Sequence, residues 1–244
     1  MKQMKRYDGR QPDQLRPVVI TKDFIKYPEG SVLIQCGDTK VICNATVEEG
    51  VPPFKRDSGS GWVTAEYNML PRATDTRNRR DISKLKLSPR SAEIQRLVGR
   101  ALRSVTDLDA LGERTITIDC DVIQADGGTR CASITGGFVA LVLALDKLRR
   151  EGAFQKLPVT GCAAAVSCGL LGEQPLLDLC YVEDSGADVD FNFVMDERDN
   201  IIEIQGTGEE RPFSKQELDA MYQLAQQGIR QLVQAQKEAI GDLL

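Results

Sequence analysis

Hydrophobic and polar residues alternate along several short stretches of the chain, and the clearest alternation covers residues 115–123. A period of two predicts a strand with one apolar face, here formed by Ile116, Ile118, Cys120 and Val122. Apolar stretches at 32–36 and 40–45 flank Gly37-Asp38-Thr39, which predicts a hairpin of two further strands. Residues 61–70 predict another strand, which Pro71 closes.

A helical period follows at residue 88. Ser88 and Pro89 favour a helix start, because a hydroxyl caps the first turn and proline fits the first helical position. The apolar positions beyond them share one helix face: Ile94, Leu97, Val98, Ala101, Leu102 and Val105. The opposite face carries Arg96, Arg100 and Arg103. Arg90 is expected nearer the buried side, where an arginine is costly unless an anion or a carboxylate meets it.

The second half of the chain alternates in the same way between strand and helix signals. Residues 132–150 have an apolar centre and a basic end, which predicts a helix. Strand-like stretches follow at 163–168, 176–183, 190–195 and 201–205. A last helix is expected from Ser214, where Glu217 completes a capping box, to about residue 240. With no linker or repeat, this order predicts one α+β domain over 1–244, with mixed sheets packed against helices.

Composition narrows the chemistry that is available. The 244 residues include no histidine, which excludes Ser-His-Asp and Cys-His nucleophiles and histidine-liganded metals. Seven cysteines are spread singly without CxxC spacing, so we expect buried, reduced thiols in a cytoplasmic protein. The first residues lack the apolar region of a secretory signal, and the longest apolar run, 138–145, is too short to span a bilayer. No membrane association is therefore expected.

Charge is distributed unevenly along the chain. The net charge is −5, yet residues 72–103 hold ten basic and three acidic residues, a net charge of +7 that leaves −12 elsewhere. A basic segment in an acidic protein is typical of a surface that meets a polyanion. The same pattern is also produced by a solvated loop and a charged helix face.

The predicted strand at 115–123 turns into the predicted helix through two glycines, a hydroxyl and an arginine, in the order Gln124-Ala125-Asp126-Gly127-Gly128-Thr129-Arg130. Glycines let the backbone approach a ligand, and the free N–H groups of a first helical turn point toward it. Arg130 adds a planar donor suited to phosphate oxygens. The stretch predicts a cradle for an oxyanion, although an ordinary glycine-rich turn has the same spacing. The Walker pattern is absent, so a P-loop nucleotidase is not expected.

Acidic residues crowd the segment before the predicted strand at 190–195. Asp184 and Asp190 flank a predicted turn, and across a hairpin two such side chains would have Cβ atoms about 5 Å apart. Carboxylates that close repel unless a proton or a cation lies between them, and Mg²⁺ is suited to one or two carboxylates plus phosphate oxygens. A solvent-exposed acidic turn is the alternative. Together, the cradle, the carboxylate pair and the basic segment point to phosphoryl chemistry on a polyanion.

Longer strings of the sequence are similar to those of a known family. They occur nearly from end to end, and include Asp8-Gly9-Arg10, Gly61-Trp62-Val63-Thr64-Ala65-Glu66-Tyr67, Met69-Leu70-Pro71-Arg72-Ala73-Thr74, Asp126-Gly127-Gly128-Thr129-Arg130 and Gln205-Gly206-Thr207-Gly208-Glu209-Glu210. The chain resembles the ribonuclease PH family, phosphate-dependent 3′-to-5′ exoribonucleases that trim transfer RNA precursors. Small departures occur at Cys131, where threonine is expected, and at Asn192, where the related polynucleotide phosphorylases have lysine.

The resemblance implies the ribonuclease PH fold, related to the second domain of ribosomal protein S5, and a homo-hexamer arranged as a trimer of dimers. It implies that inorganic phosphate is bound by Arg90, Gly128, Thr129 and Arg130. It places a metal ion, Mg²⁺ or Mn²⁺, on Asp184 and Asp190. It also assigns RNA binding to the basic loop, through Arg72, Arg77, Arg79, Arg80, Lys84 and Lys86.

The resulting hypothesis is phosphorolysis. Phosphate held by Arg90 and Arg130 attacks the last phosphodiester of an RNA 3′ end and releases a nucleoside diphosphate, a reversible reaction that positioning and electrostatics sustain without histidine. Three alternatives stay open: a non-catalytic RNA-binding subunit of an exosome-like ring, a hydrolytic metal-dependent nuclease, and a structural protein. The phosphate-binding arginines and paired aspartates distinguish phosphorolysis from all three alternatives. Cys131, beside the cradle, is expected to be a point of oxidation sensitivity.

Overall fold

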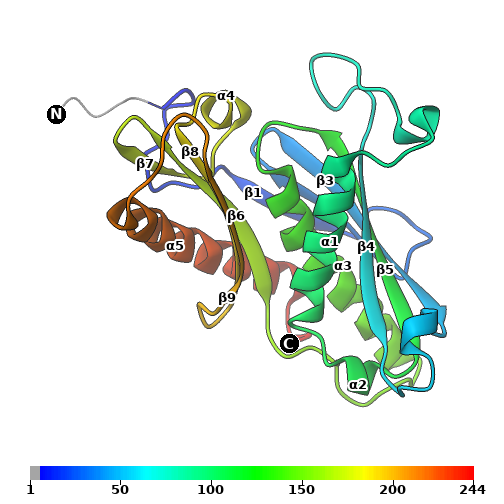
Figure 1. The fold of residues 1–244 in the computed structure, drawn as a ribbon. Coiled ribbons are helices and arrows are strands. Elements are labelled where there is room, and N and C mark those ends of the chain that lie inside the picture. Colours follow the sequence, from blue (N-terminus) through cyan, green and yellow to red (C-terminus); the bar gives the residue numbers. More distant parts are fainter. Residues whose placement is uncertain (1–5) are drawn as a thin grey trace.

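The computed structural model describes residues 6–244, with the side chains of residues 82 and 84 left outside the description, and it arranges them as two β-sheets with helices (Figure 1). The first sheet has five strands in the order β1-β2-β3-β5-β4. All neighbours are antiparallel except β4 and β5, which are parallel. The bounds are β1 (Val18–Lys22), β2 (Gly30–Cys36), β3 (Thr39–Glu49), β4 (Trp62–Met69) and β5 (Arg114–Gln124).

The second sheet has four antiparallel strands in the order β7-β6-β8-β9. They are β6 (Ala163–Leu171), β7 (Gln174–Leu177), β8 (Val189–Asp196) and β9 (Ile201–Gly208). The helices are α1 (Pro89–Arg103), α2 (Leu108–Leu111), α3 (Thr129–Arg150), α4 (Tyr181–Asp184) and α5 (Lys215–Ile240). Short 3₁₀ helices cover Pro53–Lys55 and Asp81–Lys84.

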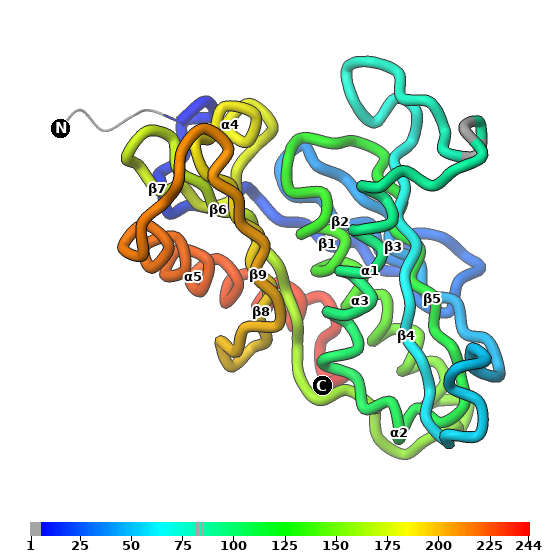
Figure 2. Tube along the Cα trace, in the orientation of Figure 1, coloured from blue at the N-terminus to red at the C-terminus, as the bar shows by residue number. Residues whose placement is uncertain are grey.

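Helix α3 lies between the two sheets and contacts strands of both (Figures 1 and 2). Its approach to β2 is so close that a Cβ at Gly30 would lie 2.0 Å from the carbonyl oxygen of Ala140. By length and composition α3 could cross a membrane, but 89% of its apolar window is buried inside the protein. It is therefore the core helix, and one hydrophobic cluster joins side chains of both sheets to it, including Val32, Phe138 and Phe193.

The structure confirms the α+β fold class and most of the predicted elements. The hairpin of β2 and β3, the strands β4 and β5, and the helices that begin after Ser88 and Ser214 lie where the sequence predicted them. The four apolar side chains of β5 are buried as expected. Both predicted N-caps form, because Ser88 accepts from the N–H of Ser91 and Ser214 forms its capping box with Glu217.

Two parts of the second half differ from the prediction. The strand expected over 176–183 ends at Leu177, and residues 181–184 form the one-turn helix α4 instead. Its capping box explains the change, because the carboxylate of Glu183 accepts from the N–H of Cys180 at 3.1 Å. The strand β1 and the short helix α2 were not predicted.

The arginines of α1 also need correction. Arg90 is exposed rather than turned toward the buried side. Arg96 and Arg100 are exposed as expected, whereas Arg103 is half-buried, stacks 4.2 Å from the ring centroid of Trp62 and donates to the carbonyl of Val63 at 2.7 Å. An arginine lying flat on an indole is favourable, so the helix face opposite the core is not purely solvated.

Candidate functional site

The turn between β5 and α3 is built by two glycines in the left-handed region, Gly127 with φ +73° and Gly128 with φ +65°. A Cβ at Gly127 would lie 2.6 Å from the carbonyl oxygen of Leu179 and 2.9 Å from the backbone nitrogen of Tyr181. From the sequence, these glycines were predicted to let a ligand approach the backbone. In the structure, Gly127 also brings the turn directly against the chain that enters α4, which carries Asp184.

The first turn of α3 begins at this point. Gly128 is its N-cap and provides no side-chain acceptor, so the first N–H groups of the helix have no side-chain cap. Such uncapped donors at a helix start are suited to an anion. The Thr129 side chain is buried, and its hydroxyl is hydrogen-bonded to the Tyr67 hydroxyl at 2.8 Å. Thr129 therefore fixes the helix start to β4.

Arg130 is held at its guanidinium by two acceptors from different layers. Its Nη1 donates to Oε1 of Gln205 on β9 at 2.6 Å and to Oε1 of Glu93 on α1 at 3.2 Å. Gln205 in turn donates to Glu93 at 2.9 Å. Within the described chain, Arg130 donates hydrogen bonds through Nη1, which leaves Nε and Nη2 available to an anion. These roles of Glu93 and Gln205 were not predicted, since no spacing signal in the sequence links residues so far apart.

Arg90 projects from the first turn of α1 beside a cavity of about 310 Å³. Tyr67 also lines this cavity, as do Arg79 and Arg80 of the basic loop. Burial raises the pKa of Tyr67, while its hydrogen bond to Thr129 and the nearby charge of Arg90 lower it. Arg90 is thus exposed yet lies close to the start of α3, which places it between the predicted cradle and the basic loop.

The two predicted carboxylates come together, but not across a hairpin. Asp184 ends α4, and Asp190 is the second residue of β8, between β6 and β9. Burial and the charge of Asp184 raise the pKa of Asp190 to about 6, and Arg130 and Arg90 oppose that rise. Burial also raises the pKa of Asp184, again against Arg90 and Arg130. These four side chains, all predicted from the sequence, therefore lie within electrostatic range of one another.

The carboxylate pair has the character of a site for a hard cation. Asp190 Oδ1 is buried and has no hydrogen-bond partner among the described residues. A buried carboxylate oxygen without a partner is costly and calls for an explanation, and a bound cation supplies one. Among residues 6–244, no group of three or more His, Cys, Asp or Glu side chains is arranged to hold a metal ion. Two carboxylates are nevertheless sufficient for Mg²⁺ when phosphate oxygens and water complete its coordination.

The basic loop between β4 and α1 projects beyond the sheets (Figure 2). All the basic side chains predicted there to bind RNA are exposed where they are described, namely Arg72, Arg77, Arg79, Arg80 and Lys86. The side chain of Lys84 lies outside the description. Of these residues, Arg79 and Arg80 share the 310 Å³ cavity with Arg90, so the loop continues into the cradle.

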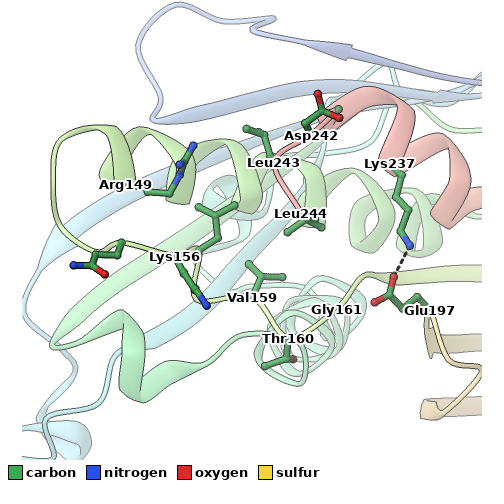
Figure 3. Close-up of a pocket in the computed structure, with 13 residues that line it drawn as sticks. Arg149, Lys156, Val159, Thr160, Gly161, Glu197, Lys237, Asp242, Leu243 and Leu244 are labelled. Carbon is green, nitrogen blue, oxygen red and sulfur yellow. Dashed lines mark ion pairs between the residues drawn. The ribbon is translucent and has the colours of Figure 1, made fainter.

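A second cavity, of about 620 Å³, lies near the C-terminal end of the chain (Figure 3). Its Lys237 and Glu197 form an ion pair at 2.6 Å. None of the predicted site residues lines it. Although this cavity is larger, it is not the candidate site, because the convergent arginines and aspartates of the predicted site lie elsewhere.

Cysteine chemistry plays no visible part in the site. All seven cysteines are free and buried, as the sequence predicted. Burial raises the pKa of the Cys131 thiol far above its usual range, and its sulfur is hydrogen-bonded to Asn192 Oδ1 at 3.3 Å. Because thiolates are the reactive form, the expected oxidation sensitivity of Cys131 is not supported.

Comparisons with known proteins find relatives that match nearly the whole chain. Residues 14–145 match the model of the 3′ exoribonuclease family, domain 1, and residues 161–228 match that of domain 2. A curated relative, the ribonuclease PH of Bacillus velezensis, is 58% identical over 240 residues, which is 98% of each chain. A solved Archaeoglobus fulgidus exosome with RNA bound to the active site superposes with a TM-score of 0.81 at 24% identity, covering 94% of this chain and 92% of that one. Rice Rrp46 gives 0.78 at 19% identity, covering 96% and 100%.

Proposed function

The chain belongs to the ribonuclease PH family of 3′ exoribonucleases, and we propose that Arg90, Arg130, Asp184 and Asp190 form its catalytic site. It is a phosphate-dependent 3′-to-5′ exoribonuclease, which converts an RNA and inorganic phosphate into a shortened RNA and a nucleoside diphosphate. The observation that carries the site assignment is electrostatic. Two guanidiniums lie close enough to a half-buried carboxylate pair to oppose the rise that burial causes in both pKa values.

Phosphate binding falls to the cradle. Arg130, fixed through Nη1, offers its remaining N–H groups, and Arg90 and the uncapped N–H groups of the α3 start complete the set of donors. A phosphate oxygen held there forms a bond to the phosphorus of the terminal nucleotide. The bond from that phosphorus to the 3′ oxygen of the preceding nucleotide breaks, and the 3′ oxygen takes a proton. Because Arg130 is fixed before the reaction, it needs little reorganisation during the reaction.

Asp184 and Asp190 would hold Mg²⁺, with Mn²⁺ as the other candidate. When bound, the ion would neutralise charge on the reacting phosphate oxygens and on the leaving 3′ oxygen. The carboxylates fit this role because Asp190 Oδ1 is buried and no group in the described part of the chain donates a hydrogen bond to it. Arg90 and Arg130 partly offset the negative charge of the pair before RNA arrives.

The basic loop is proposed to bring RNA to the cradle. Its exposed arginines meet backbone phosphates, and Arg79 and Arg80 stand at the cavity that Arg90 also lines. The 3′ ends of transfer RNA precursors are the proposed substrates.

We propose that the chain works in the cytoplasm as a homo-hexamer, a trimer of dimers. Seven buried free cysteines support a reducing compartment. Large exposed apolar side chains support association of copies, among them Tyr27, Phe54 and Tyr181. Sedimentation equilibrium tests the assembly, and a mass other than that of six chains would exclude it.

The function is tested by incubating the protein with a 3′-extended transfer RNA and Mg²⁺, with and without inorganic phosphate. We expect nucleoside diphosphates only when phosphate is present. Monophosphates would indicate hydrolysis, and no release would favour a non-catalytic RNA-binding ring subunit. Arg130→Ala should raise the phosphate requirement sharply, whereas Arg96→Ala, an exposed arginine on the other side of α1, should not.

A further inference from the structure

Three arginines of the N-terminal segment, the buried Arg6 and Arg16 and the half-buried Arg10, contact the chain around α4, although well over 150 residues separate them from it. Figure 1 shows the segment that starts at residue 6, drawn in blue, beside α4. Arg6 and Arg16 are each only 4% exposed. Arginines are rarely buried unless their donors are satisfied, so these positions have a specific purpose in the fold.

The guanidinium of Arg6 forms a bidentate ion pair with the carboxylate of Glu183. Its Nε donates to Oε1 at 2.8 Å and its Nη2 to Oε2 at 2.6 Å. The same guanidinium donates to the carbonyls of Leu177 at 2.8 Å and Asp178 at 3.0 Å. Arg6 thus joins the end of β7 to the body of α4.

Glu183 directly precedes Asp184, so whatever fixes Glu183 also fixes the proposed metal ligand. Helix α4 has only four residues, too few to be stable by itself. Its first turn depends on the carboxylate of Glu183, which accepts from the N–H of Cys180 as well as from Arg6. The backbone position of Asp184 therefore depends on a contact from the other end of the chain.

Arg16 performs the equivalent task for the cradle. Its Nε and Nη2 donate to the two oxygens of Asp178 at 3.0 and 2.6 Å, and its Nη1 donates to the carbonyl of Asp126 at 2.5 Å. The carboxylate of Asp126 accepts from the N–H of Tyr181 at 3.1 Å. The turn at Gly127 and the start of α4 are thus fixed to each other by the same N-terminal segment.

We propose that Arg6 is a positioning residue for the cation site, acting through Glu183 on Asp184. The inference rests on the proposed role of Asp184 as a ligand of the divalent ion. Residues that orient a metal ligand from behind change metal affinity by about tenfold to a hundredfold when they are altered. Arg6 and Glu183 should therefore control how tightly the ion is bound, while the hold of Arg130 on phosphate is left as it was.

Arg6→Lys tests this, because it keeps a cation while removing the fork that holds both Glu183 oxygens. Glu183→Gln tests it from the other side of the pair. The control is Arg230→Lys, which alters the ion pair between Arg230 on α5 and Asp199 in the loop between β8 and β9, away from the site. The readouts are Mn²⁺ binding to the protein without RNA, followed by electron paramagnetic resonance, and the KM for phosphate at saturating Mn²⁺.

We expect Arg6→Lys and Glu183→Gln to weaken Mn²⁺ binding by about tenfold or more, with a phosphate KM close to that of the unaltered protein. Unchanged Mn²⁺ affinity in either variant would overturn the proposal. A loss of phosphate affinity as large as the loss of Mn²⁺ affinity would overturn it too, since it would show that the whole site is disrupted. Asp184→Asn separates this failure from failure of the proposed function: if Asp184→Asn binds Mn²⁺ normally, the ligand assignment itself is wrong.

Discussion

Replacement of Gly127 by alanine tests whether the glycine is required by the contact between the turn and α4. The φ of +73° is strained for any residue with a Cβ, which costs about 1–2 kcal/mol. The new Cβ would also lie 2.6–2.9 Å from three backbone atoms of residues 179–181, which cannot rotate away. Forcing atoms into a packed site costs about 1–3 kcal/mol more. We therefore expect Gly127→Ala to lower the free energy of unfolding by about 2–5 kcal/mol.

Gly172→Ala is the matched control. Gly172 has a φ of +60°, but a Cβ added there would meet no atom within 4 Å, so only the backbone strain of about 1–2 kcal/mol applies. The free energies are measured by urea unfolding at one protein concentration, because association contributes to apparent stability. Equal destabilisation of the two variants would refute the reasoning, since it would mean that α4 moves aside freely. Gly127→Ala should also reduce phosphorolysis, because α4 carries Asp184.

Four further predictions concern the site and the core. Asp190→Asn should stabilise the metal-free protein by up to about 3 kcal/mol above pH 6, because the folded-state pKa of about 6 exceeds the ordinary 3.8. The wild-type penalty begins as pH rises through 3.8, so urea unfolding near pH 4 should show almost no difference, and a gain independent of pH would contradict this cause. Gln205→Leu should raise the KM for phosphate by about tenfold, because Arg130 loses one hydrogen bond to its charged guanidinium. An unchanged KM in steady-state kinetics would show that Gln205 does not hold Arg130. Arg80→Ala should lower the salt dependence of RNA binding, with the slope of log K against log salt reduced by about 0.7, and an identical slope would remove Arg80 from the RNA contact. We also propose that the whole chain is one domain, so calorimetry should show a single unfolding transition, because one hydrophobic cluster joins both sheets.

The sequence alone determined much of the architecture, because alternation and capping are local signals. The apolar face of β5, the hairpin of β2 and β3, and the caps at Ser88 and Ser214 depend on neighbouring residues only. The family and its activity were equally accessible, since long strings such as 126–130 are specific in themselves. The four residues Arg90, Arg130, Asp184 and Asp190 were also predicted from the sequence, and the structure brings them within electrostatic range of one another.

Tertiary structure decided how those residues are held. A strand was expected where α4 forms, because 176–183 is apolar and the capping role of Glu183 depends on Arg6 from the far end of the chain. The exposure of Arg90 depends on how α1 packs, not on its period. Likewise, Arg130 is oriented by Gln205 of the other sheet. Contacts between residues so distant in sequence leave no periodic signal, because they are set by the packing of whole elements and not by the neighbours along the chain.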